Sequence, residues 1–220
     1  MSAVLFGSIS SVADTSELQR DAFNRAFAAH GLGWRWDRDQ YRDMLDTSGG
    51  RNRIAEHARS LGQVVDAQAV HETKSTLFQQ SLSTARLSPR PGVVDTIKAA
   101  RAKGWKVGLV TSTSHANVVA LLDSLAPAVQ ADDFDVVVDA DSVARPKPEP
   151  DAYTFAVGSL SQQPGECVAV EDNLGGVHAA RSADVPCVAF PNENTAGHDF
   201  GDTRVVERLD FEDLTSASGR

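Results

Sequence analysis

The chain of 220 residues has an ordinary globular composition, with 41% hydrophobic and 23% charged residues and a formal net charge of −9 at pH 7. This acidity opposes sequence-independent binding to nucleic acid or to an anionic membrane surface, because both carry charge of the same sign. The apolar runs are too short for a membrane span of about 20 residues, and the N-terminus lacks a signal-peptide pattern. We therefore expect a soluble cytoplasmic protein without nucleic-acid or membrane partners. An anionic small ligand stays open, because a local site can be basic.

The N-terminal third combines one strand pattern with a long helical stretch. Residues 4–6 form an apolar run that predicts a buried strand, followed by a cluster of glycine and serine. Residues 15–85 then space their apolar side chains at helical intervals, as in Phe23 and Phe27. This stretch predicts an all-α module of about four helices.

From residue 87 onward, strand and helix patterns alternate. This alternation predicts parallel βαβ units and an α/β fold with a doubly wound sheet, in which residues 4–6 form the first strand. We expect a core domain of residues 1–14 and 86–220, and a helical domain of residues 15–85 inserted after strand one. The last five residues are expected to fray.

The two cysteines stand in the apolar segments CVAV and CVAF. Small buried residues pack well in such segments, so core packing is the prediction for Cys167 and Cys187. A disulfide or a metal role is the alternative, and a reducing compartment agrees with core packing.

Polar side chains follow the predicted strands where an open parallel sheet binds its ligands. Thr111 and Ser112 follow one strand, Glu171 and Asp172 follow another, and Lys147 precedes a helix. A hydroxyl group, a lysine and a carboxylate pair can together hold a phosphate beside a divalent cation. Taken singly, the lysine suits a solvated turn and the others suit helix caps. Their shared location favours a phosphate site.

The same residues carry a resemblance to a known family. Thr111, the segment RPKPEPDAY around Lys147, and Glu171-Asp172 followed by NLGGVHAARSADVPCVAF resemble the haloacid dehalogenase (HAD) superfamily of phosphotransferases. The segments RDAFNRAFAAHGLGWRWDRDQYRDMLDTSGGRNRI and LSPRPGVVDTI are similar to its β-phosphoglucomutase-like branch, above all to the CbbY-like xylulose-1,5-bisphosphate phosphatases of Rubisco operons. The resemblance spans residue 4 to about residue 214. It implies a Rossmann-like core with an inserted α-helical cap.

The resemblance also shows what the first strand lacks. In the family this strand ends in Asp-x-Asp-Gly-Thr, where the first aspartate is the nucleophile and the second is the general acid/base. An ungapped alignment puts Gly7 at the nucleophile and Ile9 at the acid/base. Neither residue can accept a phosphoryl group, exchange a proton or bind Mg²⁺ through its side chain.

The resemblance implies roles for other residues as well. Thr111, Ser112 and Lys147 would bind the transferring phosphate, and Asp172, helped by Glu171, would bind Mg²⁺. Because the nucleophile carboxylate is also a metal ligand in the family, we expect weak Mg²⁺ binding or none. In the cap, Glu17 would position the substrate, and Arg51 and Arg53 would reach its second phosphate, with a solvated helix face as the alternative for the arginines.

Three functional hypotheses follow. The leading one is a catalytically inactive or severely impaired pseudophosphatase that binds phosphorylated sugars or inorganic phosphate. The second is an active Mg²⁺-dependent sugar-phosphate phosphatase or phosphomutase that uses a non-canonical route, for which Ser8, Ser10 and Ser11 show no neighbouring base in the sequence. The third is an interaction scaffold that ignores sugar phosphates. The sequence identifies no protein partner.

Overall fold

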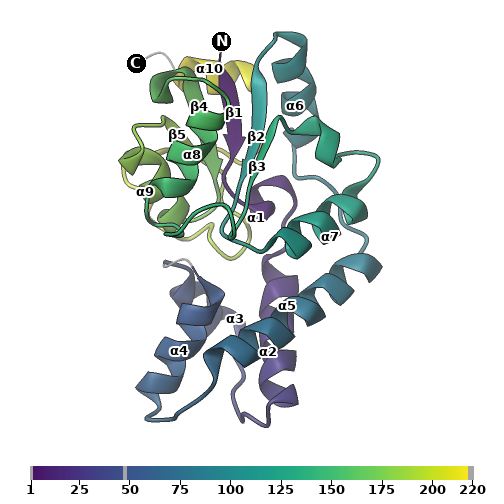
Figure 1. The fold of residues 1–220 in the computed structure, drawn as a ribbon, viewed down its shortest axis with the longest axis vertical. Helices are drawn as coiled ribbons and strands as arrows, with labels where there is room; N and C mark the ends of the chain where they lie inside the picture. Colours follow the sequence, from purple (N-terminus) through teal and green to yellow (C-terminus); the bar gives the residue numbers. More distant parts are fainter. Residues whose placement is uncertain (1, 47–48, 218–220) are drawn as a thin grey trace.

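The computed structural model describes residues 2–46 and 49–217. Its centre is a six-stranded parallel sheet with the strand order β3-β2-β1-β4-β5-β6 (Figure 1). The strands are β1 (Ala3–Phe6), β2 (Lys106–Val110), β3 (Val136–Val138), β4 (Cys167–Glu171), β5 (Cys187–Ala189) and β6 (Arg204–Val205). The predicted doubly wound α/β fold is therefore confirmed. Strand β1 lies between β2 and β4, so its carboxyl end opens at the middle of the sheet.

Helices surround the sheet and form a separate group beside it. Those of the α/β part are α1 (Ile9–Val12), α6 (Val93–Ala102), α7 (His115–Leu125), α8 (Asp151–Ser159), α9 (Leu174–Ser182) and α10 (Phe211–Ala217). Those of the second group are α2 (Ser16–Ala29), α3 (Arg38–Asp43), α4 (Gly50–Ser60) and α5 (Ala67–Thr84). Single 3-10 turns lie at η1 (Met44–Asp46), η2 (Ala131–Asp133) and η3 (Pro164–Glu166). We call α2–α5 the helical module; Figure 1 shows it beyond the end of the sheet that α1 occupies.

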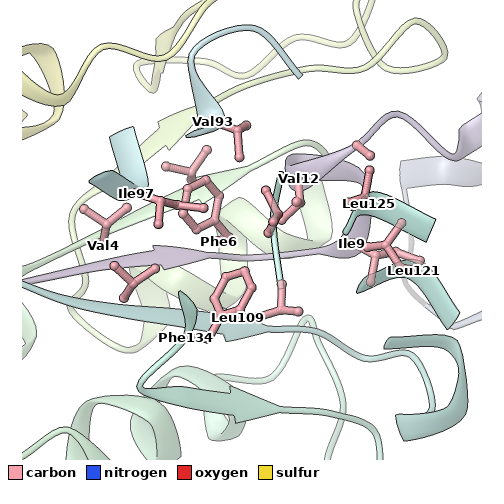
Figure 2. Close-up of a cluster of buried hydrophobic side chains, with 14 of the residues drawn as sticks. Val4, Phe6, Ile9, Val12, Val93, Ile97, Leu109, Leu121, Leu125 and Phe134 are labelled. Atoms are coloured by element: carbon pink, nitrogen blue, oxygen red, sulfur yellow. The ribbon is translucent and has the colours of Figure 1, made fainter. Parts of the chain in front are cut away.

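Both faces of β1 are buried, because its side chains alternate between two apolar clusters. Val4 and Phe6 pack on the face covered by α6 and α7, around Leu109 and Phe134 (Figure 2). Ala3 and Leu5 pack on the opposite face, against side chains of α8 and α9. The β1 strand is thereby fixed between two layers, and the loop after it starts from a rigid position.

The helical module has an apolar cluster of its own. Phe23 and Phe27 of α2 pack against Trp36 and Tyr41, and Trp36 is fully buried. The ring centroids of Phe27 and Trp36 are 4.6 Å apart in an edge-on arrangement. Aromatic pairs of this geometry add to the hydrophobic stabilisation of the module. Ala22 of α2 and Phe78 and Leu82 of α5 also join the core cluster of the sheet domain, so the module is packed onto the sheet as well.

Three elements were absent from the sequence prediction. Helix α1 forms because Ser8 caps it: Ser8 Oγ accepts from the Ser11 N–H at 2.9 Å, and Ser11 Oγ donates to the carbonyl of Ser8. Strand β6 has only two residues, both exposed, so it carries no apolar pattern. Helix α10 runs to Ala217, so the expected frayed tail falls on this helix and on residues 218–220, outside the described residues.

Both cysteines are free thiols; Cys167 is buried and Cys187 is half-buried. Burial raises the pKa of Cys167 to about 11, so its thiol stays protonated and unreactive at neutral pH. In the described residues, no helix is long and apolar enough to cross a lipid bilayer.

Candidate functional site

A cavity of about 530 Å³ lies between the strand ends and the helical module. It collects most of the residues that the sequence singled out: Gly7, Ile9, Arg51, Arg53, Thr111, Ser112, Lys147 and Asp172. Glu17 and Glu171 do not line it. Loops after β1, β2 and β4 supply its sheet side, as expected for parallel strands whose carboxyl ends meet at one edge.

The end of β1 is filled by a carboxylate from β4. A Cβ built on Gly7 would lie 2.1 Å from Oε1 of Glu171 and 2.3 Å from the hydroxyl of Tyr153. A Cβ built on Gly176 of α9 would also lie 2.1 Å from this carboxylate. Glu171 is fully buried between the two glycines, so it takes the space where a side chain at position 7 would begin.

The ammonium group of Lys147 donates to this buried carboxylate and to two backbone carbonyls. Its Nζ donates to Oε1 of Glu171 at 2.5 Å, to the carbonyl of Val110 at 2.9 Å, and to the carbonyl of Gly7. These three bonds use all three N–H groups of the ammonium. Tyr153 adds a hydrogen bond to the same Glu171 oxygen at 2.7 Å.

Burial raises the pKa of Glu171, against the opposing effect of Lys147. The same burial, together with the Glu171 charge, raises the pKa of Tyr153 well above its ordinary value. Lys147, Glu171 and Tyr153 therefore form a buried polar cluster at the floor of the cavity, in which all three N–H groups of Lys147 are used. Oε2 of Glu171 is buried and accepts no hydrogen bond from the described residues.

Asp172 faces the cavity and is surrounded by neutral donors. Its Oδ1 accepts from Ser8 Oγ at 2.7 Å and from the side-chain amide of Asn173 at 2.9 Å. Its Oδ2 accepts from the side-chain amide of Asn192 at 2.7 Å. The expectation that Ser8 lacks a neighbouring base is therefore wrong, because the parallel pairing of β1 with β4 brings Asp172 to it from 164 positions away.

Ile9 contributes an apolar side chain that belongs to the core. It is only 4% exposed and packs with Leu121 and Leu125 of α7 (Figure 2). The residue thus stabilises the attachment of α1 to the sheet, and its side chain offers no proton to a ligand.

The residues at the strand ends do not fit a Mg²⁺ site. Gly7 offers no side-chain ligand, Glu171 is held by Lys147 and Tyr153, and the Asp172 carboxylate already accepts three hydrogen bonds. Mg²⁺ requires near-octahedral oxygen ligands, usually one or two free carboxylates. Across residues 2–46 and 49–217, no group of three or more His, Cys, Asp and Glu side chains could hold a metal ion.

Thr111 and Ser112 lie at the end of β2 and line the cavity. Thr111 Oγ1 accepts from the Thr113 N–H at 3.2 Å, and Ser112 Oγ accepts from the Lys147 N–H at 3.3 Å. Both hydroxyl groups keep their own hydrogen as a donor for a ligand. They remain neutral contacts at the sheet side of the cavity.

The helical module contributes basic residues. Arg51 is exposed at the cavity, while Arg53 is 8% exposed and donates to the carbonyl of Met44 at 2.9 Å. The guanidinium of Arg53 also lies 5.7 Å from the ring centroid of Tyr41. The structure thus brings both predicted arginines to the same cavity as Thr111 and Ser112.

Two further basic residues of the cavity, His71 and Lys74 of α5, escaped the sequence analysis. Lys74 is 4% exposed, and burial, reinforced by the Arg53 charge, lowers its pKa to about 7. Burial, reinforced by Lys74 and the arginines, lowers the pKa of His71 to about 4. The available signal was spacing: Lys74 stands in the buried stripe that Val70, Phe78 and Leu82 define on α5.

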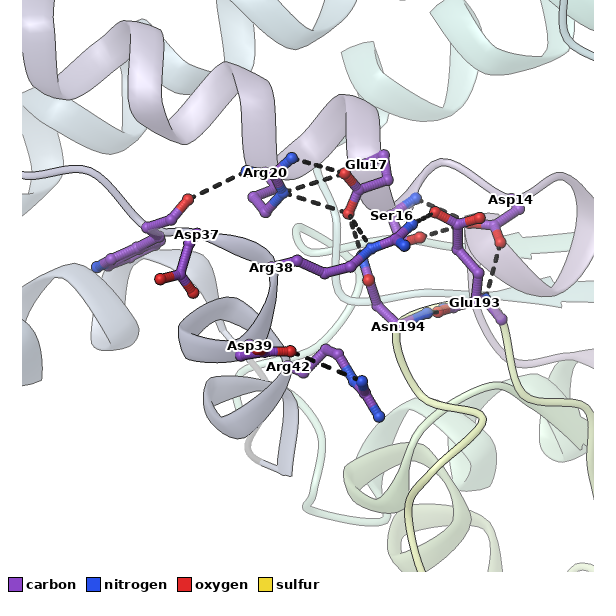
Figure 3. A network of polar contacts seen from close by, with 12 residues as sticks. Asp14, Ser16, Glu17, Arg20, Asp37, Arg38, Asp39, Arg42, Glu193 and Asn194 are labelled. Atoms are coloured by element: carbon purple, nitrogen blue, oxygen red, sulfur yellow. Dashed lines mark hydrogen bonds and ion pairs between the residues drawn. The ribbon is translucent and has the colours of Figure 1, made fainter.

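Glu17 lies where the helical module meets the loop after β5. Its carboxylate accepts from Arg20 at 2.7 Å and from the side-chain amide of Asn194 at 2.7 Å, with Arg38 at 3.6 Å (Figure 3). The Asn194 bond joins α2 to the loop after β5, and the Arg20 bond lowers the pKa of Glu17. Glu17 fastens the helical module to the sheet domain beside the cavity, outside its lining.

A six-stranded parallel sheet, a helical insertion after the first strand and a cavity at the strand ends are found together in a family of hydrolases. The family model for haloacid dehalogenase-like hydrolases matches residues 6–184. The chain belongs to this family, whose members typically use Mg²⁺.

Among individual proteins, the chain is similar to Protein CbbY of Cereibacter sphaeroides, with 35% identity over 99% of this chain and 95% of the relative. Protein CbbY of Rhodobacter capsulatus is 36% identical over 91% of this chain and 89% of its own length. The crystal structure of CbbY from Rhodobacter sphaeroides in complex with phosphate superposes with a TM-score of 0.87, covering 94% of each chain at 35% identity. A mutant of that protein has been crystallised with xylulose-1,5-bisphosphate.

Proposed function

We propose that this chain is a sugar-phosphate-binding pseudophosphatase of the CbbY-like group, inactive or severely impaired in the aspartyl-phosphate chemistry of its family. One observation carries the proposal. The cavity presents four basic residues from the helical module, while the β1 end has no side chain at Gly7 and is filled by the Glu171 carboxylate. The basic residues therefore support anion binding in the cavity, and Gly7 at the end of β1 offers no nucleophile to the bound anion.

The size of the expected loss in kcat favours an inactive or severely impaired protein. Removing a covalent nucleophile from a cooperating catalytic set costs about 10⁶ in kcat, or roughly 8 kcal/mol of transition-state stabilisation. At this site the acid/base position also holds a core isoleucine, Ile9. Asp172 alone cannot supply a Mg²⁺ cage, so we propose that Mg²⁺ binds weakly or not at all.

In this proposal the helical module, residues 15–85, acts as a cap over the core domain of residues 1–14 and 86–220. The ligand is a phosphorylated sugar or inorganic phosphate, as the phosphate and xylulose-1,5-bisphosphate complexes of the CbbY relative suggest. The free thiols of Cys167 and Cys187 agree with a cytoplasmic location. We propose no nucleic-acid partner, because the formal net charge of −9 opposes binding to nucleic acid.

A second candidate function is an active phosphatase or phosphomutase that uses a non-canonical route. The observation in its favour is the 2.7 Å hydrogen bond from Ser8 Oγ to Asp172 Oδ1, which pairs a hydroxyl with a carboxylate base inside the cavity. In this alternative, Ser8→Ala abolishes phosphate release and leaves ligand binding in place.

The experiment that separates the two measures binding and turnover on the same protein. Isothermal titration with inorganic phosphate and sugar phosphates is combined with a phosphate-release assay in Mg²⁺. We expect binding without release. Release that disappears in both Ser8→Ala and Asp172→Asn would replace the pseudophosphatase with the second candidate. No binding of any of these ligands would contradict both.

A further inference from the structure

The cavity has opposite charges at its two ends. The helical module supplies Arg51, Arg53, His71 and Lys74 to its lining and no acidic side chain, among the described residues. The sheet side supplies two carboxylates, Asp141 and Asp172. Its one described cation, Lys147, is neutralised by Glu171 at 2.5 Å. A ligand in the cavity therefore meets a basic end and an acidic end.

Lys74 marks the basic end as an anion site. The residue is 4% exposed, and its Nζ donates to Gln19 Oε1 at 3.1 Å and lies 4.8 Å from the ring centroids of both Phe23 and Phe78. In the described part of the chain no carboxylate pairs with it. A buried charge without a counter-ion is costly, and this one faces a cavity, so an anionic ligand is the partner that would compensate it.

The sheet end is arranged for hydroxyl groups. Lys147 has no N–H left for a phosphate, and the negative charge of Asp172 repels one. The other polar contacts there, Ser112 and Asn192 among them, are neutral. Asp172 accepts three hydrogen bonds in the absence of a ligand and has room for a fourth, because a carboxylate has about four acceptor positions.

We propose that the cavity binds sugar monophosphates in one orientation, with the phosphate against Lys74 and Arg51 and the unphosphorylated, hydroxyl-bearing end against Asp172, and that it discriminates against a second phosphate. This inference rests on the proposed function, because it assumes that phosphorylated sugars enter the cavity. It narrows that function to ligands with one phosphate.

The test compares one ligand series by isothermal titration, in buffer containing a chelator so that no divalent cation contributes. The probes are xylulose-1,5-bisphosphate, xylulose 5-phosphate, xylulose 1-phosphate and inorganic phosphate. We expect at least one monophosphate to bind about tenfold more tightly than the bisphosphate, because the second phosphate of the bisphosphate meets Asp172. Inorganic phosphate should bind more weakly than that monophosphate, because it lacks the hydroxyl-bearing end.

Two substitutions test the basic end and the acidic end of the cavity separately. Lys74→Met keeps the apolar stem of the side chain without its ammonium group and should weaken monophosphate binding about tenfold or more, with Arg51→Gln as a second, exposed variant should Lys74→Met fail to fold. Asp172→Asn should strengthen bisphosphate binding about tenfold, because it removes the negative charge that repels the second phosphate. Matched controls are Arg59→Gln, an exposed cation of α4 outside the cavity, and Asp132→Asn, an exposed acid outside it; both should bind like the parent.

The inference is overturned if the bisphosphate binds about tenfold more tightly than both monophosphates, or if Asp172→Asn leaves bisphosphate binding unchanged. The first result would place a phosphate at the sheet end, and the second would show that Asp172 does not repel the second phosphate. Both would leave the proposed function intact. Failure of every probe to bind would contradict the proposed function as well as this inference.

Discussion

The packing of Glu171 against Gly7 predicts a large steric effect of a single methyl group. In Gly7→Ala the new Cβ would lie 2.1 Å from Oε1 of Glu171, well inside any van der Waals contact. The carboxylate cannot simply swing aside, because Lys147 and Tyr153 hold it at 2.5 Å and 2.7 Å. The φ of Gly7 lies outside the left-handed region, so alanine suits the backbone and the effect is purely steric.

Overpacking of a core typically costs about 1–3 kcal/mol of unfolding free energy, and the fixed carboxylate puts this site at the upper end, about 3 kcal/mol. For a chain of this size each kcal/mol lowers Tm by about 2–4 °C, so we expect Gly7→Ala to melt roughly 6–12 °C below the parent. Gly7→Asp should cost at least as much, because it adds a charge to the same place.

The assay is thermal and urea denaturation followed by circular dichroism. The matched control is Gly158→Ala in α8, where a Cβ would meet nothing within 4 Å and alanine gains about 1 kcal/mol of helix propensity. In a background of Glu171→Ala, the Gly7→Ala change should cost at least about 1 kcal/mol less. A Gly7→Ala protein within about 0.5 kcal/mol of the parent would refute the reasoning.

Three further predictions concern the polar contacts of the site. Lys147→Met strands the fully buried Glu171 charge, so we expect a loss of about 3–5 kcal/mol in urea denaturation, and adding Glu171→Gln should recover part of it; a loss below about 1 kcal/mol would show that the pair is not buried. Ser8→Ala removes the cap of α1 and the bond to Asp172, which should cost about 1–2 kcal/mol in the same assay; unchanged stability would contradict the capping role. Burial lowers the pKa of Lys74 from 10.5 to about 7, so the folded chain binds fewer protons than the unfolded chain between these values, and stability rises with pH across that window. Lys74→Met should flatten this rise between about pH 7 and about pH 9, and an unchanged slope would contradict the lowered pKa of Lys74.

The sheet was predictable from the sequence because its strands are short apolar runs separated by helical periods. The strand at Lys106–Val110 has the bounds that the apolar run indicates, and the helical stretch resolves into the four helices α2–α5. Strand β6 could not be found this way, since its two residues are exposed and pair only through the backbone. Helix α1 could have been found from its capping serines, Ser8 and Ser11, three positions apart.

The site was predictable in its location and less so in its bonding. Parallel strand ends meet at one edge, so Thr111, Lys147 and Asp172 had to come close together. The hydrogen-bond partner of each charged side chain depends on distances in the folded structure, and the spacing of residues in the sequence does not give these distances. Lys147 turned toward Glu171 because Gly7 leaves room for that carboxylate, and Asp172 received Ser8 as a partner. Lys74 escaped because a single buried lysine interrupts an otherwise apolar helix face without altering its period.

The central claim is that this chain binds phosphorylated sugars without transferring their phosphate. The most direct measurement follows inorganic phosphate release from xylulose-1,5-bisphosphate and its two monophosphates in Mg²⁺, at protein concentrations where titration shows the site to be occupied. We expect saturable binding and a release rate equal to that of the buffer blank. Release above the blank that is lost in Asp172→Asn would contradict this claim.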